Sequence, residues 1–283
     1  MARMRISVKQ INLFGPLQRP SIGGCPRAWG FAYLDGLKPD YLAPQLVEGI
    51  KFHAVCASLV ADGRMPAPAF LQPGVELLPE EVLPESHLGR MGRASLIHLP
   101  QREYGEWLVE HVGSFPWTTD RGVACTIDLR PDLTSAPLGA PALNYLVDFK
   151  STSNRRYALK TLLHDVQANI YAAGLMHHGA TAVLARWIYV SKKDYSSWPV
   201  EAVFHKARTE AWIHENVDAT IELIHTIREA GNITALDLPG DIEACGGVGR
   251  FCDHEARCLK GPVGALPPRL ISLDEIVRFK EGK

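Results

Sequence analysis

The spacing of hydrophobic residues predicts a helix early in the chain and strands in its middle. Four side chains fall near one helical face in the stretch 44–60, namely Leu46, Ile50, His53 and Val60. This periodicity predicts a helix over 44–60. The stretch 61–104 is rich in proline and glycine and has weak periodicity, so we expect loops with short helices there. Residues 1–24 have the composition of an irregular arm.

The central part of the chain is expected to form a sheet. Apolar runs bounded by turn residues predict strands at 105–115, 122–130, 143–150 and 182–190, with an edge strand at 200–204. The loop 131–142 is rich in proline, glycine and alanine, which suits an antiparallel connection between the second and third of these strands. Apolar residues at helical spacing predict helices over 157–178, ended by Gly179, and over 206–230.

Together these elements predict an α/β fold, in which a small mixed β-sheet is flanked by helices. A length of 283 residues allows one such domain with appendages, or two small domains. We expect an arm at 1–24, a core at 25–236 and a cysteine-containing segment at 237–283. Within the core, 25–104 form the helical part and 105–204 the sheet that carries the candidate site.

Two acidic side chains and a lysine are expected on one side of this sheet. In the strand 143–150, Asp148 and Lys150 share the face opposite Val147 and Phe149, and Asp128 lies opposite the apolar face of the strand before it. Two converging carboxylates repel each other unless a cation lies between them, and hard oxygen ligands suit Mg²⁺ or Mn²⁺. A lysine beside such a metal can orient an attacking water, which predicts phosphodiester hydrolysis. Taken alone, Asp148-x-Lys150 is more simply a salt bridge at a strand end.

The order of these residues along the chain resembles the motifs of RecB-like PD-(D/E)XK nucleases. The matching residues are Asp128, then Asp148-Phe149-Lys150, then Gln167-x-x-x-Tyr171. Upstream, Gly49-x-x-x-His53 is similar to the first motif of the family, and Glu110 resembles a glutamate often found near its site. One departure is Cys125, because the family usually has a glycine three residues before the lone aspartate.

The resemblance implies a restriction-endonuclease-like core and a metal-dependent deoxyribonuclease. His53, Asp128, Asp148 and the carbonyl of Phe149 would bind Mg²⁺ or Mn²⁺. Lys150 would position the nucleophilic water. Gln167 and Tyr171 would support the site and the DNA strand.

The cysteines indicate a second metal site. Six are present, and in a reducing cytoplasm clustered cysteines indicate metal or redox chemistry rather than disulfides. Cys25-Pro26-Arg27 resembles the N-terminal motif of the iron–sulphur exonucleases of this superfamily, of the AddB and CRISPR-adaptation types. That resemblance implies a [4Fe–4S] cluster that clips the N- and C-terminal segments together, held by Cys25, Cys245, Cys252 and Cys258. The gap between Cys245 and Cys252 is longer than usual, and four thiolates suit structural zinc nearly as well. Cys56 and Cys125 are expected in the core.

Charge gives mild evidence against nucleic-acid binding, because the net charge is −1 and many DNA binders are markedly basic. A local basic rim is still possible, and the candidates for phosphate contacts are Arg27, Arg155, Arg156 and Lys160. A solvated charged face explains each of them about as well. Trp29 and Trp187 have the residue type that stacks on bases, although a core role is more common at such positions.

The expected function is hydrolysis at DNA ends by an exonuclease that prefers single strands. An endonuclease of the same superfamily and a DNA-binding adaptor that does not cut are the alternatives. No apolar run reaches the roughly 18–20 residues that span a bilayer. The N-terminus also lacks the apolar core of a signal peptide, so a cytoplasmic location without membrane partners is expected. Protein partners in a recombination, repair or CRISPR complex are compatible with this function.

Overall fold

The computed structural model describes residues 4–14, 25–37, 44–61, 71, 75–100, 107–135, 143–155 and 161–238. The chain is of mixed α/β type and divides into two compact units. Unit 1 consists of Met1–Ala43, Pro116–Asp128 and Ala211–Lys283. Unit 2 consists of Pro44–Phe115 and Leu129–Glu210. Both units are therefore assembled from segments that are separated along the sequence.

Unit 2 is built on a five-stranded mixed sheet with the order β2-β5-β6-β7-β8. Its strands are β2 (Trp107–Val109), β5 (Leu133–Ser135), β6 (Leu143–Thr152), β7 (Ala182–Ser191) and β8 (Ser197–His205). The central pair, β6 and β7, is parallel, and the remaining pairs are antiparallel. A parallel pair needs a crossover connection, which the helix α5 (Val166–His177) supplies between the two strands.

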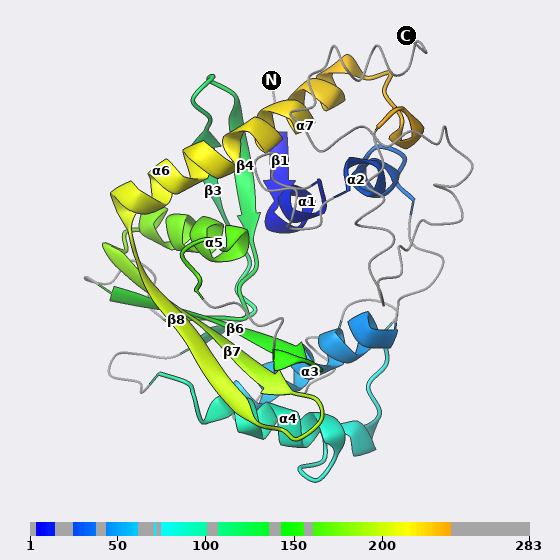
Figure 1. The fold of residues 1–283 in the computed structure, drawn as a ribbon, viewed down its shortest axis with the longest axis vertical. Helices are drawn as coiled ribbons and strands as arrows, with labels where there is room; N and C mark the ends of the chain where they lie inside the picture. Colours follow the sequence, from blue (N-terminus) through cyan, green and yellow to red (C-terminus); the bar gives the residue numbers. More distant parts are fainter. Residues whose placement is uncertain are drawn as a thin grey trace. The chain divides into compact units, whose positions relative to one another are not determined.

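Helices cover both faces of this sheet. Figure 1 shows α3 (Pro44–Val60) and α4 (His87–Leu96) on one face and α5 on the other, and a short 3-10 helix, η3 (Pro79–Val82), precedes α4. The α3 side encloses a buried hydrophobic cluster that includes Phe52, Val147, Phe149, Ile188 and Val190. Successive residues of a strand point to opposite faces, so Asp148 and Lys150 lie on the α5 side. The alternation expected for 143–150 is confirmed.

Most of unit 1 is a small sheet covered by helices. The strands β1 (Met4–Ser7), β3 (Gly113–Thr118) and β4 (Ala124–Leu129) have the order β1-β4-β3, with β1 and β4 parallel. The helical elements are α1 (Val8–Phe14), α2 (Pro26–Tyr33), α7 (Asp218–Ala230) and the 3-10 helix η5 (Ala235–Asp237), together with the second half of α6 (Lys206–Asn216), whose first half belongs to unit 2. Trp29 is fully buried against Phe14, with ring centroids 5.3 Å apart. Trp187 is also fully buried in unit 2, so the core interpretation of both tryptophans is confirmed.

Several predicted elements agree closely with the structure. The helix expected over 44–60 is α3, and the strands expected at 143–150, 182–190 and 200–204 are β6, β7 and β8. The short helices expected within 61–104 are η3 and α4. These elements have strong periodicity or clear turn residues at their ends, which is why the sequence reveals them.

Other predictions are wrong in extent. Residues 4–14 form β1 and α1 rather than an irregular arm. The helix expected from 157 begins only at Val166, because the side chain of Asp165 caps it by accepting a hydrogen bond from the Ala168 amide at 2.7 Å. The helix expected over 206–230 is two helices, interrupted at Val217, where φ is −121°.

The pairing of the strands also differs from expectation. The strand expected at 122–130 is β4, but it pairs with β1 and β3 in the three-stranded sheet, not with β6. The antiparallel partner of β6 is instead β5, a three-residue strand inside the expected loop 131–142. The single predicted sheet is therefore two sheets.

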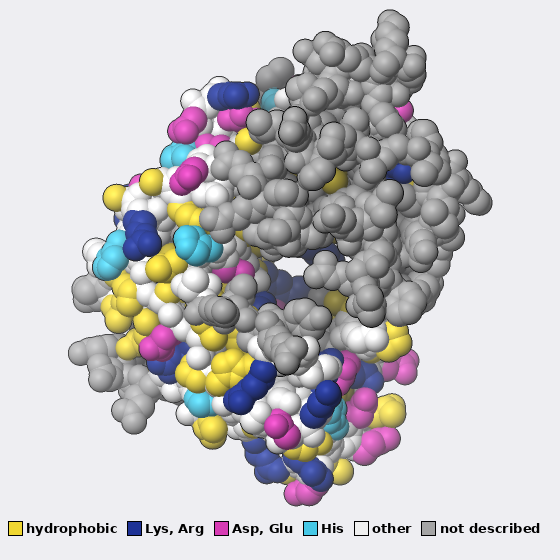
Figure 2. Space-filling view, viewed as in Figure 1, with side chains coloured by type: hydrophobic (Ala, Val, Ile, Leu, Met, Phe, Trp, Pro, Cys, Tyr) yellow, Lys and Arg dark blue, Asp and Glu magenta, His cyan; other side chains and the backbone are white. Residues whose placement is uncertain are grey.

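Charges of both signs are interspersed on the face of unit 2 that is seen in Figure 2. Figure 2 shows Lys and Arg side chains beside Asp and Glu side chains over α4 and η3, and basic next to hydrophobic side chains over β8. Among the helices of the described segments, none is both long and apolar enough to cross a membrane.

Candidate active site

Asp132 connects three elements of unit 2. It lies just before β5, and one of its carboxylate oxygens accepts a hydrogen bond from the backbone amide of Phe149 in β6 at 2.7 Å. The other oxygen lies 2.9 Å from Nδ1 of His53, which α3 supplies. Asp132 is 8% exposed, so these two contacts fix a nearly buried carboxylate beside the middle of β6.

Asp148, Lys150 and Gln167 form a closed set of contacts on the α5 side of the sheet. Nζ of Lys150 lies 2.5 Å from one carboxylate oxygen of Asp148. It also donates to Oε1 of Gln167 at 3.2 Å. Nε2 of Gln167 donates to the other oxygen of Asp148 at 2.8 Å. Gln167 is in the first turn of α5, so the crossover helix holds Asp148 and Lys150 of β6 in position.

The electrostatics of the site show that its carboxylates are close enough to interact. Burial and the neighbouring charge of Asp132 raise the pKa of Asp148 to about 6, despite the opposing effect of Lys150. Burial alone would lower the pKa of Lys150, but Asp148 and Asp132 outweigh it, and the net pKa is raised. Lys150 therefore remains a cation near neutral pH.

His53 and Asp132 form a charge-stabilised pair. Burial disfavours the protonated ring of His53, but the charge and hydrogen bond of Asp132 outweigh this, and the pKa of His53 is raised. Burial likewise opposes ionisation of Asp132, and His53 reverses the effect, so the pKa of Asp132 is lowered. Nδ1 of His53 contacts Asp132, so the tautomer with a proton on Nδ1 leaves Nε2 as a ligand atom.

Glu110 reaches the same cluster from a strained backbone position. Its φ is 49°, in the left-handed region, and its amide donates to the carbonyl of Asp132 at 2.8 Å. Its carboxylate accepts from Nε of Arg130 at 2.8 Å, and burial followed by the charge of Asp132 raises its pKa. Ligand atoms of His53, Glu110 and Asp132 all lie within 4.8 Å of one another. The bend at Glu110 also separates β2 from β3, which the sequence predicts as one strand.

Tyr171 supports this arrangement rather than facing solvent. Its hydroxyl donates to the carbonyl of Arg130 at 3.0 Å, and burial followed by the charge of Asp148 raises its pKa. Tyr171 therefore fixes the backbone of Arg130, whose side chain forms the ion pair with Glu110. Gln167, one turn before Tyr171 on α5, contacts Asp148 directly, whereas Tyr171 reaches the cluster through the backbone of Arg130.

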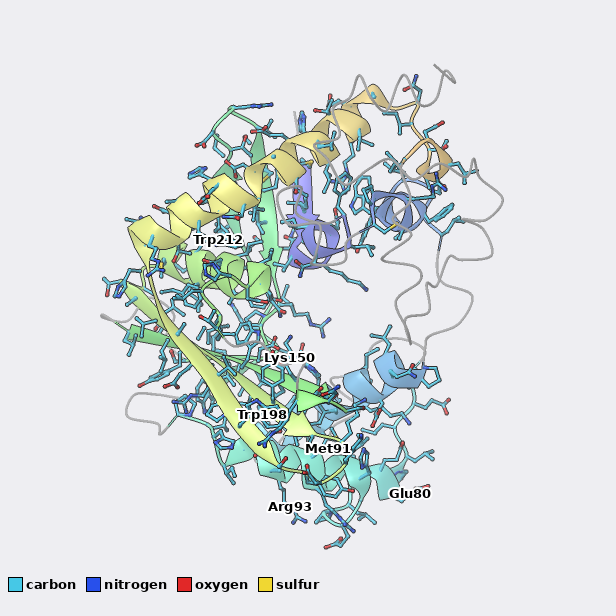
Figure 3. The ribbon with its side chains drawn as sticks, in the orientation of Figure 1. Glu80, Met91, Arg93, Lys150, Trp198 and Trp212 are labelled. Carbon is cyan, nitrogen blue, oxygen red and sulfur yellow. The ribbon has the colours of Figure 1, made fainter. Side chains whose placement is uncertain are left out.

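The donor set of the cluster fits a divalent cation. Among the described residues, His53, Glu110 and Asp132 have ligand atoms close enough to share one cation, and carboxylate oxygens are the ligands that suit Mg²⁺ and Mn²⁺. Burial first, and then the charge of Asp132, raises the pKa of Asp148 against the opposing effects of Lys150 and His53. A cation bound at the cluster would favour the ionised carboxylate. Figure 3 labels Lys150 at this part of the sheet, where its side chain projects from β6.

The sequence predicts Asp128 as the second carboxylate of this site, whereas the structure brings Asp132 to it. Asp128 belongs to unit 1 and lies on β4, where it accepts from Nη2 of Arg5 at 2.5 Å. The difference follows from the strand pairing, since the neighbour of β6 is β5 and not β4. Other predicted members, His53, Asp148, Phe149, Lys150 and Gln167, do lie together. Tyr171 joins them through Arg130.

The candidate DNA-contacting residues differ in their surroundings. Arg27 is 4% exposed, and its Nε donates to the carbonyl of Leu238 at 2.8 Å, so it is a buried structural group rather than a phosphate contact. Arg155 is exposed, and its guanidinium lies over the ring of Trp198. Arg156 and Lys160 lie outside the described residues.

The cysteines of the predicted clip are described only in part. Cys25 is a free, buried residue directly before α2. Cys245, Cys252 and Cys258 lie outside the described residues. Cys56 and Cys125 are fully buried, so their expected core position is confirmed.

The chain was compared with solved structures, with curated proteins and with models of protein families. A solved structure described as "Crystal structure of SSO0001" is 12% identical, and the alignment covers 81% of this chain and 80% of that one. Its TM-score is 0.38, a similarity too low to support an argument about the fold. Comparison with curated proteins gave no match.

A family model described as "PD-(D/E)XK nuclease superfamily" matches residues 21–259. The matched range includes the whole candidate site, and Pro131-Asp132 followed by Asp148-Phe149-Lys150 spells the residue pattern that gives the superfamily its name. This dipeptide is the signal that identifies Asp132 from the sequence. The chain belongs to the PD-(D/E)XK nuclease superfamily.

Proposed function

We propose that this protein is an exonuclease that depends on Mg²⁺ or Mn²⁺ and hydrolyses phosphodiester bonds at DNA ends, with a preference for single strands. Membership of the superfamily implies a metal-dependent nuclease with DNA as its substrate. The observation that carries the proposal is the convergence of Asp132, Asp148 and His53 beside Lys150. Action at ends rests on the resemblance of the sequence motifs to iron–sulphur exonucleases.

The proposed metal ligands are Asp132, Asp148, His53 and the carbonyl of Phe149, with Glu110 as a further candidate. When bound, the metal lowers the pKa of a water ligand and polarises a phosphoryl oxygen. The protein contributes fixed positions for these groups. Because Asp132 holds the Phe149 amide and His53 at once, strand β6 and helix α3 cannot shift independently at the site.

Lys150 is proposed to orient the attacking water and to stabilise negative charge on the phosphate. Its raised pKa keeps it protonated, so it acts as a cation and hydrogen-bond donor rather than as a base. Gln167 positions it, because the amide contacts both Lys150 and Asp148. Tyr171 has a supporting role through its bond to the Arg130 carbonyl.

A second part of the proposal concerns the cysteines. We propose that Cys25, Cys245, Cys252 and Cys258 bind a [4Fe–4S] cluster, with structural zinc as the alternative. Cys25 stands at the start of α2, where a fixed helix would present its thiolate. A cluster held by both ends of the chain would close a long loop and stabilise the fold. The absorption spectrum of anaerobically purified protein separates the two metals, since zinc–thiolate sites are colourless and iron–sulphur clusters absorb broadly in the visible.

The rival functions make different predictions about circular DNA. An endonuclease cuts closed circular single strands, whereas an exonuclease requires an end. A non-cutting adaptor binds DNA without shortening it, but the complete set of carboxylates and lysine favours catalysis.

The test is cleavage of end-labelled linear and closed circular DNA, each single- or double-stranded, with Mg²⁺, Mn²⁺ or EDTA. Metal-dependent shortening of linear DNA alone, lost in Lys150→Ala, is the expected result. Cleavage of closed circular DNA would show an endonuclease and reject the exonuclease proposal. DNA binding without any metal-dependent cleavage would support the non-cutting adaptor.

A further inference from the structure

A row of side chains crosses the sheet of unit 2 from Lys150 to the edge strand. In the register of the sheet, Lys150 of β6 pairs with Tyr189 of β7, and Tyr189 pairs with Trp198 of β8. Directly paired residues point to the same face, so all three side chains lie on the α5 side. Neighbouring strands are about 4.8 Å apart, so the row from Lys150 to Trp198 spans roughly 10 Å.

The outer end of this row is an aromatic platform. The rings of Tyr189 and Trp198 are stacked, with centroids 5.7 Å apart and an angle of 9° between their planes. Tyr189 is buried, but Trp198 is only half-buried, so part of the tryptophan is open to solvent. Figure 3 labels Trp198 on β8 and Lys150 on β6 in the same part of the sheet.

A planar cation already occupies this platform. The guanidinium carbon of Arg155 lies 4.4 Å from the centroid of the Trp198 ring. Arg155 follows the end of β6, and its side chain is exposed. A flat group can therefore approach the ring of Trp198, and a positive charge lies beside it. Base–aromatic stacking next to a basic group is the combination that binds single-stranded nucleic acid.

We propose that Trp198 and Arg155 form a subsite for one unpaired base of the DNA strand, next to the nucleotide whose phosphate is cut. This inference rests on the proposed nuclease function and specifies how its site selects a single strand. The base takes the place of the guanidinium over Trp198, and Arg155 moves to an adjacent phosphate. A base inside a duplex cannot present its face in this way, because its neighbours cover it on both sides.

The alternative is that Trp198 only covers Tyr189 at the edge of the sheet. Three variants separate the two explanations. Trp198→Leu keeps apolar cover and removes the stacking ring, Trp198→Phe keeps a ring, and Arg155→Gln removes the cation from an exposed position. Thermal unfolding of each variant shows whether the fold is retained.

The experiment uses short single-stranded oligonucleotides, each with one abasic residue at a different distance from its end. Binding to the full chain is measured in EDTA, and single-turnover cleavage is measured separately in Mg²⁺ or Mn²⁺. For the wild type we expect one abasic position to weaken binding by about 10-fold, because one stacked base is lost there. Trp198→Leu should bind intact and abasic strands equally, and Trp198→Phe should recover part of the difference.

Arg155→Gln keeps the proposal testable if Trp198→Leu does not fold. This variant should bind all strands more weakly than the wild type, and the slope of log affinity against log salt concentration should fall by about one. The weaker binding of the abasic strand relative to the intact strand should remain. The proposal is overturned if the wild type shows no position-dependent penalty, or if the penalty persists in a folded Trp198→Leu protein. Binding is measured without metal, so it does not depend on cleavage. If the wild type binds one abasic strand more weakly but cuts no DNA, the nuclease function is refuted and the base subsite is still supported.

Discussion

The carboxylate of Asp132 accepts a hydrogen bond from the backbone amide of Phe149, the residue between Asp148 and Lys150. One acidic side chain thus fixes the strand segment that carries both the second acid and the lysine. The same carboxylate contacts His53. The positions of four candidate site residues therefore depend on Asp132, namely His53, Asp148, Phe149 and Lys150. Preorganised positions of this kind matter because small displacements at a catalytic site cost large factors in rate.

Exchange of each aspartate for asparagine should distinguish Asp132 from Asp128. Asp132→Asn removes a charge that the metal needs but keeps an acceptor for Phe149, so we expect cleavage to fall by about 100-fold or more with the fold intact. Asp128→Asn removes an exposed ion pair with Arg5, which solvent screens, so the change should affect stability little. Its cleavage should stay near the wild-type rate. Single-turnover rates and calorimetric metal affinity are the measurements, and the reverse order of effects would restore Asp128 to the site.

Gln167 should act through Lys150 and Asp148. Gln167→Ala removes both contacts, and we expect a loss of about 10- to 100-fold in kcat, the range seen when the partner of a site ligand is removed. In a Lys150→Ala background the same change should reduce kcat little further, because the effects of substitutions at residues that act as one unit do not add. Equal factors in both backgrounds would show that Gln167 acts independently of Lys150.

Two helical glycines of unit 2 should respond oppositely to alanine. Among the described residues nothing lies within 4 Å of a Cβ built at Gly49, so Gly49→Ala should stabilise α3 by about 0.5–1 kcal/mol. A Cβ at Gly92 would lie 2.9 Å from Leu59 Cδ1 and 3.1 Å from Val55, so Gly92→Ala should gain nothing or lose stability. Denaturant unfolding measures both.

Gly49 is also one turn before His53, on the same helical face. If the DNA backbone passes close to this turn, Gly49→Ala lowers kcat/KM while it raises stability. Unchanged kcat/KM in the more stable variant would exclude a close approach at Gly49.

The buried thiols should be inert in the folded protein. Burial raises the pKa of Cys125 to about 12, and burial raises that of Cys56 as well. The thiolate is the reactive form, so at pH 8 almost none is present and iodoacetamide should not modify either residue until denaturant is added. Peptide mass mapping before and after unfolding checks this, and rapid native labelling of Cys125 would contradict its buried environment.

The sequence predicts the parts of the site that lie on long, regular elements. His53 on α3, Asp148 and Lys150 on β6, and Gln167 on α5 follow from periodicity and motif order, and the structure brings them together. Alternation along β6 also predicts which side chains enter the core.

Asp132 could not be found from periodicity, because β5 has only three residues and lies in a stretch that resembles a loop. Such a strand forms through its neighbours, and its hydrogen bonds to β2 and β6 supply what its own sequence lacks. The interruption at Val217 is also a tertiary effect. The side chain of Asp218 accepts from Nε1 of Trp117 at 2.8 Å and from the amide of Asp120, so a distant segment fixes where α7 begins.

The interleaving of the two units has a consequence for biosynthesis. Strand β1 pairs with β4 more than a hundred residues later, and its unit also needs α7, which leaves the ribosome later still. Unit 2 can complete its sheet once β8 has emerged, whereas the first segment of unit 1 must wait with Ile6 and Ile11 uncovered. During synthesis, Ile6 and Ile11 therefore stay exposed until α7 has emerged, and this is the segment that a holding chaperone would shield.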